Sequence, residues 1–158
     1  MKTKVLFVCL GNICRSPAAE AVFYQKIKSN NIENLFEVDS AGTGSWHIGK
    51  TADKRMINAA KQRNINITSI ARQIDVQDFF YFDYIFTMDE DNFLQINNIA
   101  KQLENPIKAK IIKLLSYLKD PNLTEVPDPY FGGDEGFDFV LDILSEAIEK
   151  LISDIKSN

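Results

Sequence analysis

The sequence predicts an α/β protein with a four-stranded parallel sheet in the order 2-1-3-4 and helices on both faces of that sheet. Short apolar segments alternate with helix-like segments along the chain. Strands that alternate with helices pair in parallel through right-handed crossovers. The composition is 45% hydrophobic and 25% charged over 158 residues, which fits a single globular domain spanning residues 1–158.

The first strand is predicted from the apolar residues Val5–Val8 and ends at Cys9. A short loop follows, and Ser16-Pro17 then marks the start of a helix that continues through AAEAVFYQKIK. Serine is a favoured N-cap and proline a favoured first helical residue. We therefore expect Ser16 to cap this helix.

The later elements continue the same alternation. We expect strands over 36–42 and 84–88 and from 110, and helices over 51–64, 89–103 and 137–155. The last helix carries its apolar residues at helical spacing. In a sheet ordered 2-1-3-4, Rossmann-like or flavodoxin-like, ligands bind beyond the carboxyl ends of the strands at the switch point. Cys9 and Asp89 stand at the two strand ends there, and we interpret Asp89 as a helix N-cap or a supporting residue.

The loop from Leu10 to Cys14 has the character of an anion-binding nest. A loop that closes onto a helix N-terminus turns several backbone N–H groups toward one point, and the helix dipole favours negative charge there. Gly11 and Asn12 readily adopt the strained backbone that such a nest needs. Arg15 adds a planar fork for two phosphate oxygens, and the positive surroundings favour the thiolate of Cys9 as a nucleophile. The loop is therefore predicted to bind a phosphate and to attack its phosphorus.

Two other kinds of site fit these residues poorly. A nucleotide-binding P-loop requires Gly-Lys-Ser/Thr at its end, and this loop has none. A metal site is not expected, because Cys9 and Cys14 have only one histidine in the whole chain to join them.

The string VCLGNICRSPAAEAVF, with DSAGTGSWHIG, FDYIFTMDEDN and VPDPYFGG further on, resembles the low-molecular-weight protein tyrosine phosphatases over essentially the whole chain. The resemblance implies hydrolysis of protein phosphotyrosine and of small aryl phosphates through a cysteinyl-phosphate intermediate, without a cofactor. It makes Cys9 the nucleophile, Arg15 the phosphate ligand and Asp128 the general acid. The residues around Asp128 alone would equally fit a turn aspartate.

The resemblance also implies supporting roles. Ser16 would donate a hydrogen bond to the Cys9 sulfur, while Asn12 and Ser40 would hold the shape of the loop. Ser69 stands where the family often has a histidine. The phosphate-binding loop then consists of Leu10, Gly11, Asn12, Ile13, Cys14 and Ser16, and the substrate walls are Trp46, His47, Tyr130 and Phe131.

Composition restricts the partners. A net charge of −4 without a basic cluster argues against nucleic acid, and no apolar run approaches the length of a membrane span. Two cysteines only five residues apart fit a reducing compartment. We expect a cytoplasmic protein whose partners are phosphotyrosine-containing proteins and phosphate or other oxyanions.

Three alternative functions remain at this point. A thiol-coupled arsenate reductase needs further cysteines, and a non-catalytic phosphate-binding module needs no acid such as Asp128. A phosphoarginine phosphatase resembles relatives with threonine at the position of Ile13. Cys14 is open to two interpretations, a packing residue or a thiol that captures oxidised Cys9 as a disulfide.

Overall fold

The computed structural model of the protein describes residues 1–130 and 132–158. The helices and strands are β1 (Thr3–Cys9), α1 (Arg15–Ser29), η1 (Glu33–Leu35), β2 (Phe36–Gly42), α2 (Lys54–Lys61), α3 (Asp78–Tyr81), β3 (Tyr84–Thr87), α4 (Glu90–Lys101), β4 (Lys110–Lys113), η2 (Leu114–Leu118) and α5 (Glu135–Ser157).

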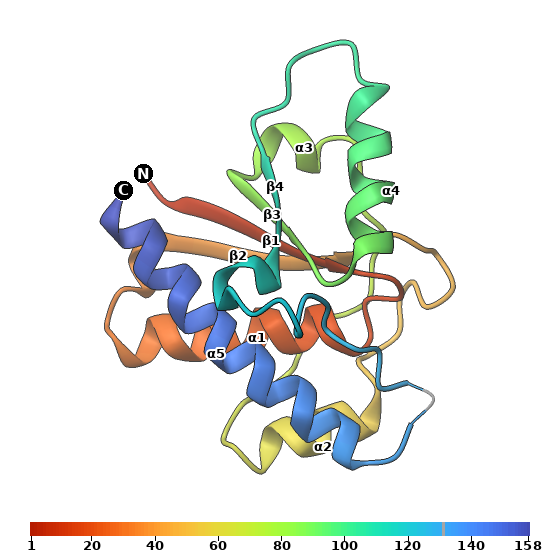
Figure 1. Ribbon diagram of the computed structural model, residues 1–158, viewed down its shortest axis with the longest axis vertical. Helices are drawn as coiled ribbons and strands as arrows, with labels where there is room; N and C mark the ends of the chain where they lie inside the picture. Colours follow the sequence, from red (N-terminus) through yellow and green to blue (C-terminus); the bar gives the residue numbers. More distant parts are fainter. Residues whose placement is uncertain (131) are drawn as a thin grey trace.

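The four strands form one parallel sheet in the order β2-β1-β3-β4, which confirms the predicted topology. Helices cover both faces, as Figure 1 shows: α1, α2 and α5 lie on one side of the sheet, and α3 and α4 lie on the other. Successive residues of β1 point to opposite faces, as in any strand. Val5 and Phe7 therefore join one apolar core, and Leu6 and Val8 join the other.

The first core is the larger and holds α1 and α5 against the sheet. Phe7 packs between Phe23 of α1 and Phe86 of β3, with ring centroids 5.8 and 5.6 Å apart. The apolar stripe predicted for the last helix is buried along most of its length. Burial of this face fixes α1 beneath β1, and it therefore fixes the loop that joins them.

Three local predictions differ from the structure. The first helix begins at Arg15 with Cys14 as its N-cap, so the prediction that Ser16 caps it is wrong. Helix α2 is shorter than the predicted 51–64: it starts later because Asp53, which accepts the N–H of Arg55, caps it, and it ends at Lys61. The four-residue helix α3 was not predicted, since a single turn is too short to show a periodic pattern.

The described residues also bear on membrane insertion. Across residues 1–130 and 132–158, none of the helices combines the length and apolarity that a membrane crossing requires.

Candidate active site

A cavity of about 200 Å³ opens at the carboxyl end of β1. Its walls come from the loop after β1, the loop after β2 and the segment before α5, three parts of the chain that are distant in sequence. The lining residues are Cys9, Leu10, Gly11, Ile13, Cys14, Arg15, Trp46, His47, Asp128 and Tyr130. The structure therefore brings together at one cavity most of the residues that the sequence singled out.

The backbone of residues 10–14 forms the floor of the cavity. Its carbonyl groups point outward, since Leu10 and Ile13 accept the N–H groups of Gly44 at 2.9 Å and Asp53 at 2.8 Å. The N–H groups of residues 10–14 donate to no backbone acceptor in the described part of the chain. Donors left free in a turn next to a helix N-terminus are suited to an anion.

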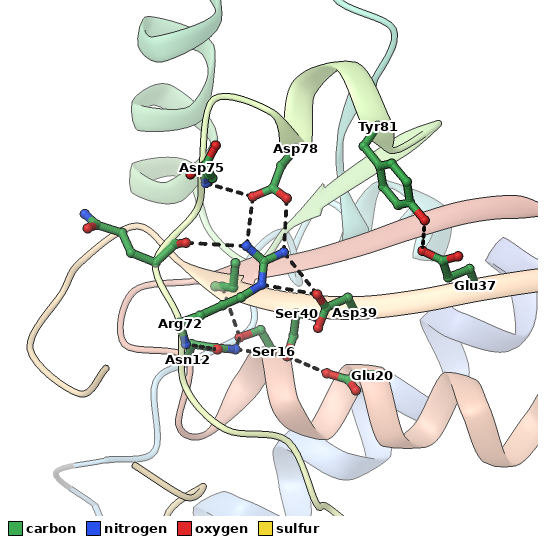
Figure 2. A network of polar contacts seen from close by, with 12 residues as sticks. Asn12, Ser16, Glu20, Glu37, Asp39, Ser40, Arg72, Asp75, Asp78 and Tyr81 are labelled. Atoms are coloured by element: carbon green, nitrogen blue, oxygen red, sulfur yellow. Dashed lines mark hydrogen bonds and ion pairs between the residues drawn. The ribbon is translucent and has the colours of Figure 1, made fainter. Parts of the chain in front are cut away.

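Asn12 holds this loop in shape. Its φ of 57° lies in the left-handed region, which asparagine adopts more readily than most residues. Its side-chain oxygen accepts the backbone N–H of Arg72 at 3.0 Å, so the amide nitrogen must point the other way. That nitrogen donates to the hydroxyls of Ser16 at 2.8 Å and Ser40 at 3.0 Å, as Figure 2 shows.

The sulfur of Cys9 lies 2.9 Å from the Ser16 hydroxyl and 3.4 Å from the Ser16 N–H. The Ser16 oxygen accepts a hydrogen bond from Asn12, and its own proton has two acceptors within reach, the Cys9 sulfur at 2.9 Å and the Ala41 carbonyl at 3.4 Å, of which the sulfur is the nearer. Both contacts to the sulfur therefore come from Ser16, one from its hydroxyl and one from its backbone N–H. Ser16 therefore sits inside the first turn of α1 with its hydroxyl directed at Cys9.

Arg15 is only 3% exposed and lies between two carboxylates. Its guanidinium donates to Asp89 at 2.7 Å and to the carbonyl of Val126 at 3.0 Å, and it lies 3.6 Å from Asp128. Burial alone would favour the neutral guanidine. Interactions with Cys9, Asp89 and Asp128 outweigh burial and raise the pKa of Arg15 above its ordinary value. The guanidinium therefore stays charged beside the cavity.

Asp89 serves two elements at once. One carboxylate oxygen receives Arg15, and the other caps α4 by accepting the N–H of Asn92 at 2.8 Å. The predicted N-cap and supporting role are both present in this geometry.

Asp128 reaches the cavity from the segment before α5. One of its oxygens accepts the N–H of Tyr130 at 3.1 Å, and the other faces Arg15. Its side chain is 38% exposed, so the carboxyl group lies at the mouth of the cavity, accessible to water. Pro127 and Pro129 flank it and restrict the backbone on both sides.

The upper walls of the cavity are aromatic. The rings of His47 and Tyr130 lie with their centroids 6.0 Å apart, and Trp46 stands at the rim, 69% exposed. The Trp46 ring covers Gly44, where a Cβ atom would lie 1.8 Å from it, so any larger residue at position 44 would displace the indole. Phe131, the fourth predicted wall residue, lies outside the described residues.

Two further residues support the loop and were not found by sequence reasoning. Glu20 accepts the Ser40 hydroxyl at 2.6 Å, and Arg72 pairs with Asp39 and Asp78 while its backbone orients Asn12 (Figure 2). Burial raises the pKa of Glu20 to about 7; the nearby Asp39 adds to the shift, and the hydrogen bond from Ser40 opposes it. A charged residue among the small apolar residues of α1 was the available signal for Glu20, whereas nothing local marks Arg72.

Ser69 and Cys14 lie at different places around the loop. Ser69, at the position where a histidine was expected from the resemblance, lines a separate cavity next to Glu20. Cys14 is a buried free thiol in the wall of the main cavity. Burial, with Asp53 and Cys9 nearby, raises the pKa of Cys14, so this second thiol stays protonated.

Metal ligands are not assembled here. Within the described ranges, no three His, Cys, Asp or Glu side chains are placed to hold a metal ion together.

Comparison with known proteins gives consistent matches over the whole chain. A family model described as "Low molecular weight phosphotyrosine protein phosphatase" matches residues 4–158. The human protein of that description is 46% identical over 136 residues, which covers 86% of this chain and 85% of the human one.

Two solved structures show the same architecture. A protein tyrosine phosphatase from Entamoeba histolytica, crystallised with Hepes in its active site, is 44% identical and superposes with a TM-score of 0.89 over 99% of this chain and 98% of that one. A Drosophila arginine phosphatase is 37% identical and superposes with a TM-score of 0.94 over 100% of this chain and 99% of that one.

Proposed function

The chain belongs to the low molecular weight phosphotyrosine protein phosphatase family of hydrolases, and from this premise we propose how its own residues hydrolyse an aryl phosphate. The phosphoryl group binds in the cavity floor, where the N–H groups of residues 10–14 and the Arg15 guanidinium receive its oxygens. The observation that supports this placement is the convergence of the Cys9 sulfur, the Arg15 guanidinium and the Asp128 carboxyl on one small cavity.

In the first step the Cys9 thiolate attacks phosphorus in line with the leaving group. The sulfur–phosphorus bond forms and the bond from phosphorus to the aryl oxygen breaks. The leaving oxygen takes the electron pair, and Asp128 supplies its proton. Loop amides and Arg15 stabilise the charge on the equatorial oxygens, and losing one such donor typically costs about 10²–10³ in rate.

In the second step water replaces the sulfur. Asp128, now ionised, accepts a proton from the water, whose oxygen attacks phosphorus while the sulfur–phosphorus bond breaks. Cys9 leaves as a thiolate, which the Ser16 hydroxyl at 2.9 Å stabilises. The products are phosphate and regenerated enzyme, so the two steps balance without a cofactor.

The substrates that we propose are phosphotyrosine residues of proteins. The rings of Trp46, His47 and Tyr130 offer stacking surfaces to a phenyl ring, a gain that an alkyl phosphate lacks. We also propose that the protein works in the cytoplasm, because a thiolate nucleophile needs reducing conditions and both cysteines are free thiols.

Phosphoarginine is the one competing substrate that a specific observation favours, namely the likeness to the Drosophila arginine phosphatase. Ile13, a buried apolar side chain in the cavity wall, favours phosphotyrosine over phosphoarginine as the substrate. An apolar wall suits a phenyl ring better than it suits a guanidinium group, which would lose its hydration there.

The test compares Cys9→Ser with the wild type on p-nitrophenyl phosphate and on matched peptides that carry phosphotyrosine, phosphoserine or phosphoarginine. We expect Cys9→Ser to lose turnover while still binding inorganic phosphate or vanadate. For the wild type we expect kcat/KM for phosphotyrosine to exceed that for phosphoserine by about two- to tenfold for each aromatic contact made by the phenyl ring. Substantial turnover by Cys9→Ser would rule out Cys9 as the nucleophile. A preference for the phosphoarginine peptide would rule out phosphotyrosine as the preferred substrate.

A further inference from the structure

A second hollow adjoins the active-site cavity. This open groove of about 630 Å³, called the rim groove here, shares Ile13, His47 and Tyr130 with the cavity. It extends from there along residues 50–55, which lead into the first turn of α2. A phosphotyrosine bound in the cavity would therefore have the adjoining residues of its own chain at the rim groove.

The rim groove carries a local positive charge in a chain whose net charge is −4. Lys50 and Lys54 are both exposed, and neither forms an ion pair with any residue in the described ranges. Among the described residues that line the groove, Asp53 is the only acidic one, and its carboxylate is held by the Arg55 guanidinium at 2.9 and 3.1 Å. The two lysines therefore remain as the uncompensated charges of this surface.

The rim groove is also held firmly to the phosphate-binding loop. The N–H of Asp53 donates to the carbonyl of Ile13 at 2.8 Å, and Arg55 donates to the carbonyl of Tyr130 at 2.7 Å. The N–H of Lys50 donates to the carbonyl of His47 at 2.9 Å. A surface fixed in this way loses little conformational freedom when a peptide binds.

An acidic residue outside the lining also acts on the rim groove. Asp134 acts electrostatically on Arg55, so the end near Arg55 carries both signs of charge. Lys50 and Lys54 line the same groove, and Lys54 directly precedes Arg55 in the sequence. An extended peptide advances about 3.3 Å per residue, so a few residues beside the phosphotyrosine span from the cavity into the adjoining rim groove.

We propose that the rim groove binds the substrate chain beside the phosphotyrosine and that Lys50 and Lys54 select substrates with acidic residues two to four positions from it. The inference rests on the proposed function, because it presupposes a phosphotyrosine in the cavity. Lys50 and Lys54 are specificity-determining residues in this arrangement. They do not touch the phosphoryl group, so a small aryl phosphate does not sense them.

The experiment measures kcat/KM for three phosphotyrosine peptides that differ only in carrying Glu, Gln or Lys at the flanking positions. The test protein carries Lys50→Glu and Lys54→Glu. The matched control carries Lys61→Glu and Lys101→Glu, which change the net charge equally at exposed sites outside the groove. Lys54 is the first residue of α2, where a glutamate is favourable to the helix dipole, so we expect the test protein to fold.

For the wild type we expect the Glu peptide to exceed the Lys peptide about five- to twentyfold in kcat/KM at low salt, as two exposed ion pairs would give, and by less at high salt. The test protein should lose or invert this preference, and the control should keep it. Retention of the preference by the test protein would overturn the proposal, as would an equal loss in the control. Turnover of p-nitrophenyl phosphate should match the wild type in both variants, and failure of all proteins on that substrate would count against the proposed function instead.

Discussion

The ion pair between Arg15 and Asp89 links the stability of the fold to the order of the active site. The guanidinium and the carboxylate are 2.7 Å apart, with 4% of the Arg15 side chain and 22% of the Asp89 side chain exposed. The second oxygen of Asp89 caps α4 through Asn92. The Asp89 side chain therefore both pairs with Arg15 and caps α4, and two substitutions of Asp89 can distinguish these two contributions.

Asp89→Asn keeps a good N-cap but loses the charge, whereas Asp89→Ala loses both. Two unit charges about 4 Å apart attract each other by about 4 kcal/mol at an effective dielectric constant of about 20. Removing one partner of a buried pair typically costs about 3–5 kcal/mol. Asp89 is partly exposed and Arg15 keeps the carbonyl of Val126, so we expect Asp89→Asn to lower the free energy of unfolding by about 2–3 kcal/mol. Asp89→Ala should lose about 1 kcal/mol more, the usual value of an N-cap.

Activity should fall along with stability, because Arg15 is then held by fewer partners. Complete loss of a stabilising donor costs about 10²–10³ in rate, and we expect a smaller loss, about 10–10², in kcat/KM on p-nitrophenyl phosphate. Inorganic phosphate supplies Arg15 with a new anionic partner. It should therefore raise the melting temperature of Asp89→Asn by more than it raises that of the wild type.

The assay is thermal and denaturant unfolding with and without phosphate, together with steady-state kinetics. Asp91→Asn is the matched control, since Asp91 is exposed in the first turn of the same helix and its carboxylate accepts a hydrogen bond from the Gln95 side chain. It should stay within about 0.5 kcal/mol of the wild type. If Asp89→Asn is as stable and as active as Asp91→Asn, the pair does not support the site and the reasoning fails.

Three further outcomes are expected. Asp128→Asn should slow turnover strongly for aryl phosphates with poor leaving groups and less for good ones, and an equal loss across the series would indicate a structural role. The pKa of Glu20 is raised from 4.5 to about 7 in the folded protein, so its stabilising effect is complete below about pH 4.5 and is lost as the pH rises through about 7. Unfolding between pH 4.5 and 7.5 should show the wild type losing up to about 3 kcal/mol relative to Glu20→Gln, and parallel pH profiles would contradict this assignment. After mild peroxide, Cys14 should condense with the sulfenic acid of Cys9 to give a disulfide and water, so reductant restores the wild type more fully than Cys14→Ala. Equal recovery of the two proteins would leave Cys14 as a packing residue only.

Much of the architecture was readable in the sequence because it is encoded locally. The apolar run before Cys9 and the segment FEVDSAG both became strands, the second with the predicted bounds Phe36–Gly42. The parallel pairing followed from the alternation of strands and helices, and the predicted order 2-1-3-4 is the one observed. That order by itself predicted that the ends of β1 and β3, with Cys9 and Asp89, meet at the site.

Ser16 shows where a local rule fails. Its position before a proline favours an N-cap, yet the structure starts the helix two residues earlier than that cap implies and directs the hydroxyl to the Cys9 sulfur. A serine hydroxyl can form its hydrogen bond either with a backbone N–H at a helix N-cap or with a nearby sulfur atom. The choice depends on Asn12, whose own orientation is set by Arg72, a residue 60 positions away.

The short helix α3, the burial of Glu20 beside Ser40 and the lysines of the rim groove were likewise decided by tertiary structure. Each depends on segments that are far apart in sequence, such as the attachment of Asp53 to Ile13 or of Arg55 to Tyr130. The sequence determined the strands, the nest and the nucleophile, because backbone preference and apolar periodicity act over a few residues. The partners of its buried polar groups were left to the tertiary structure, because a desolvated hydroxyl, amide or carboxylate takes whichever partner packing brings within about 3 Å.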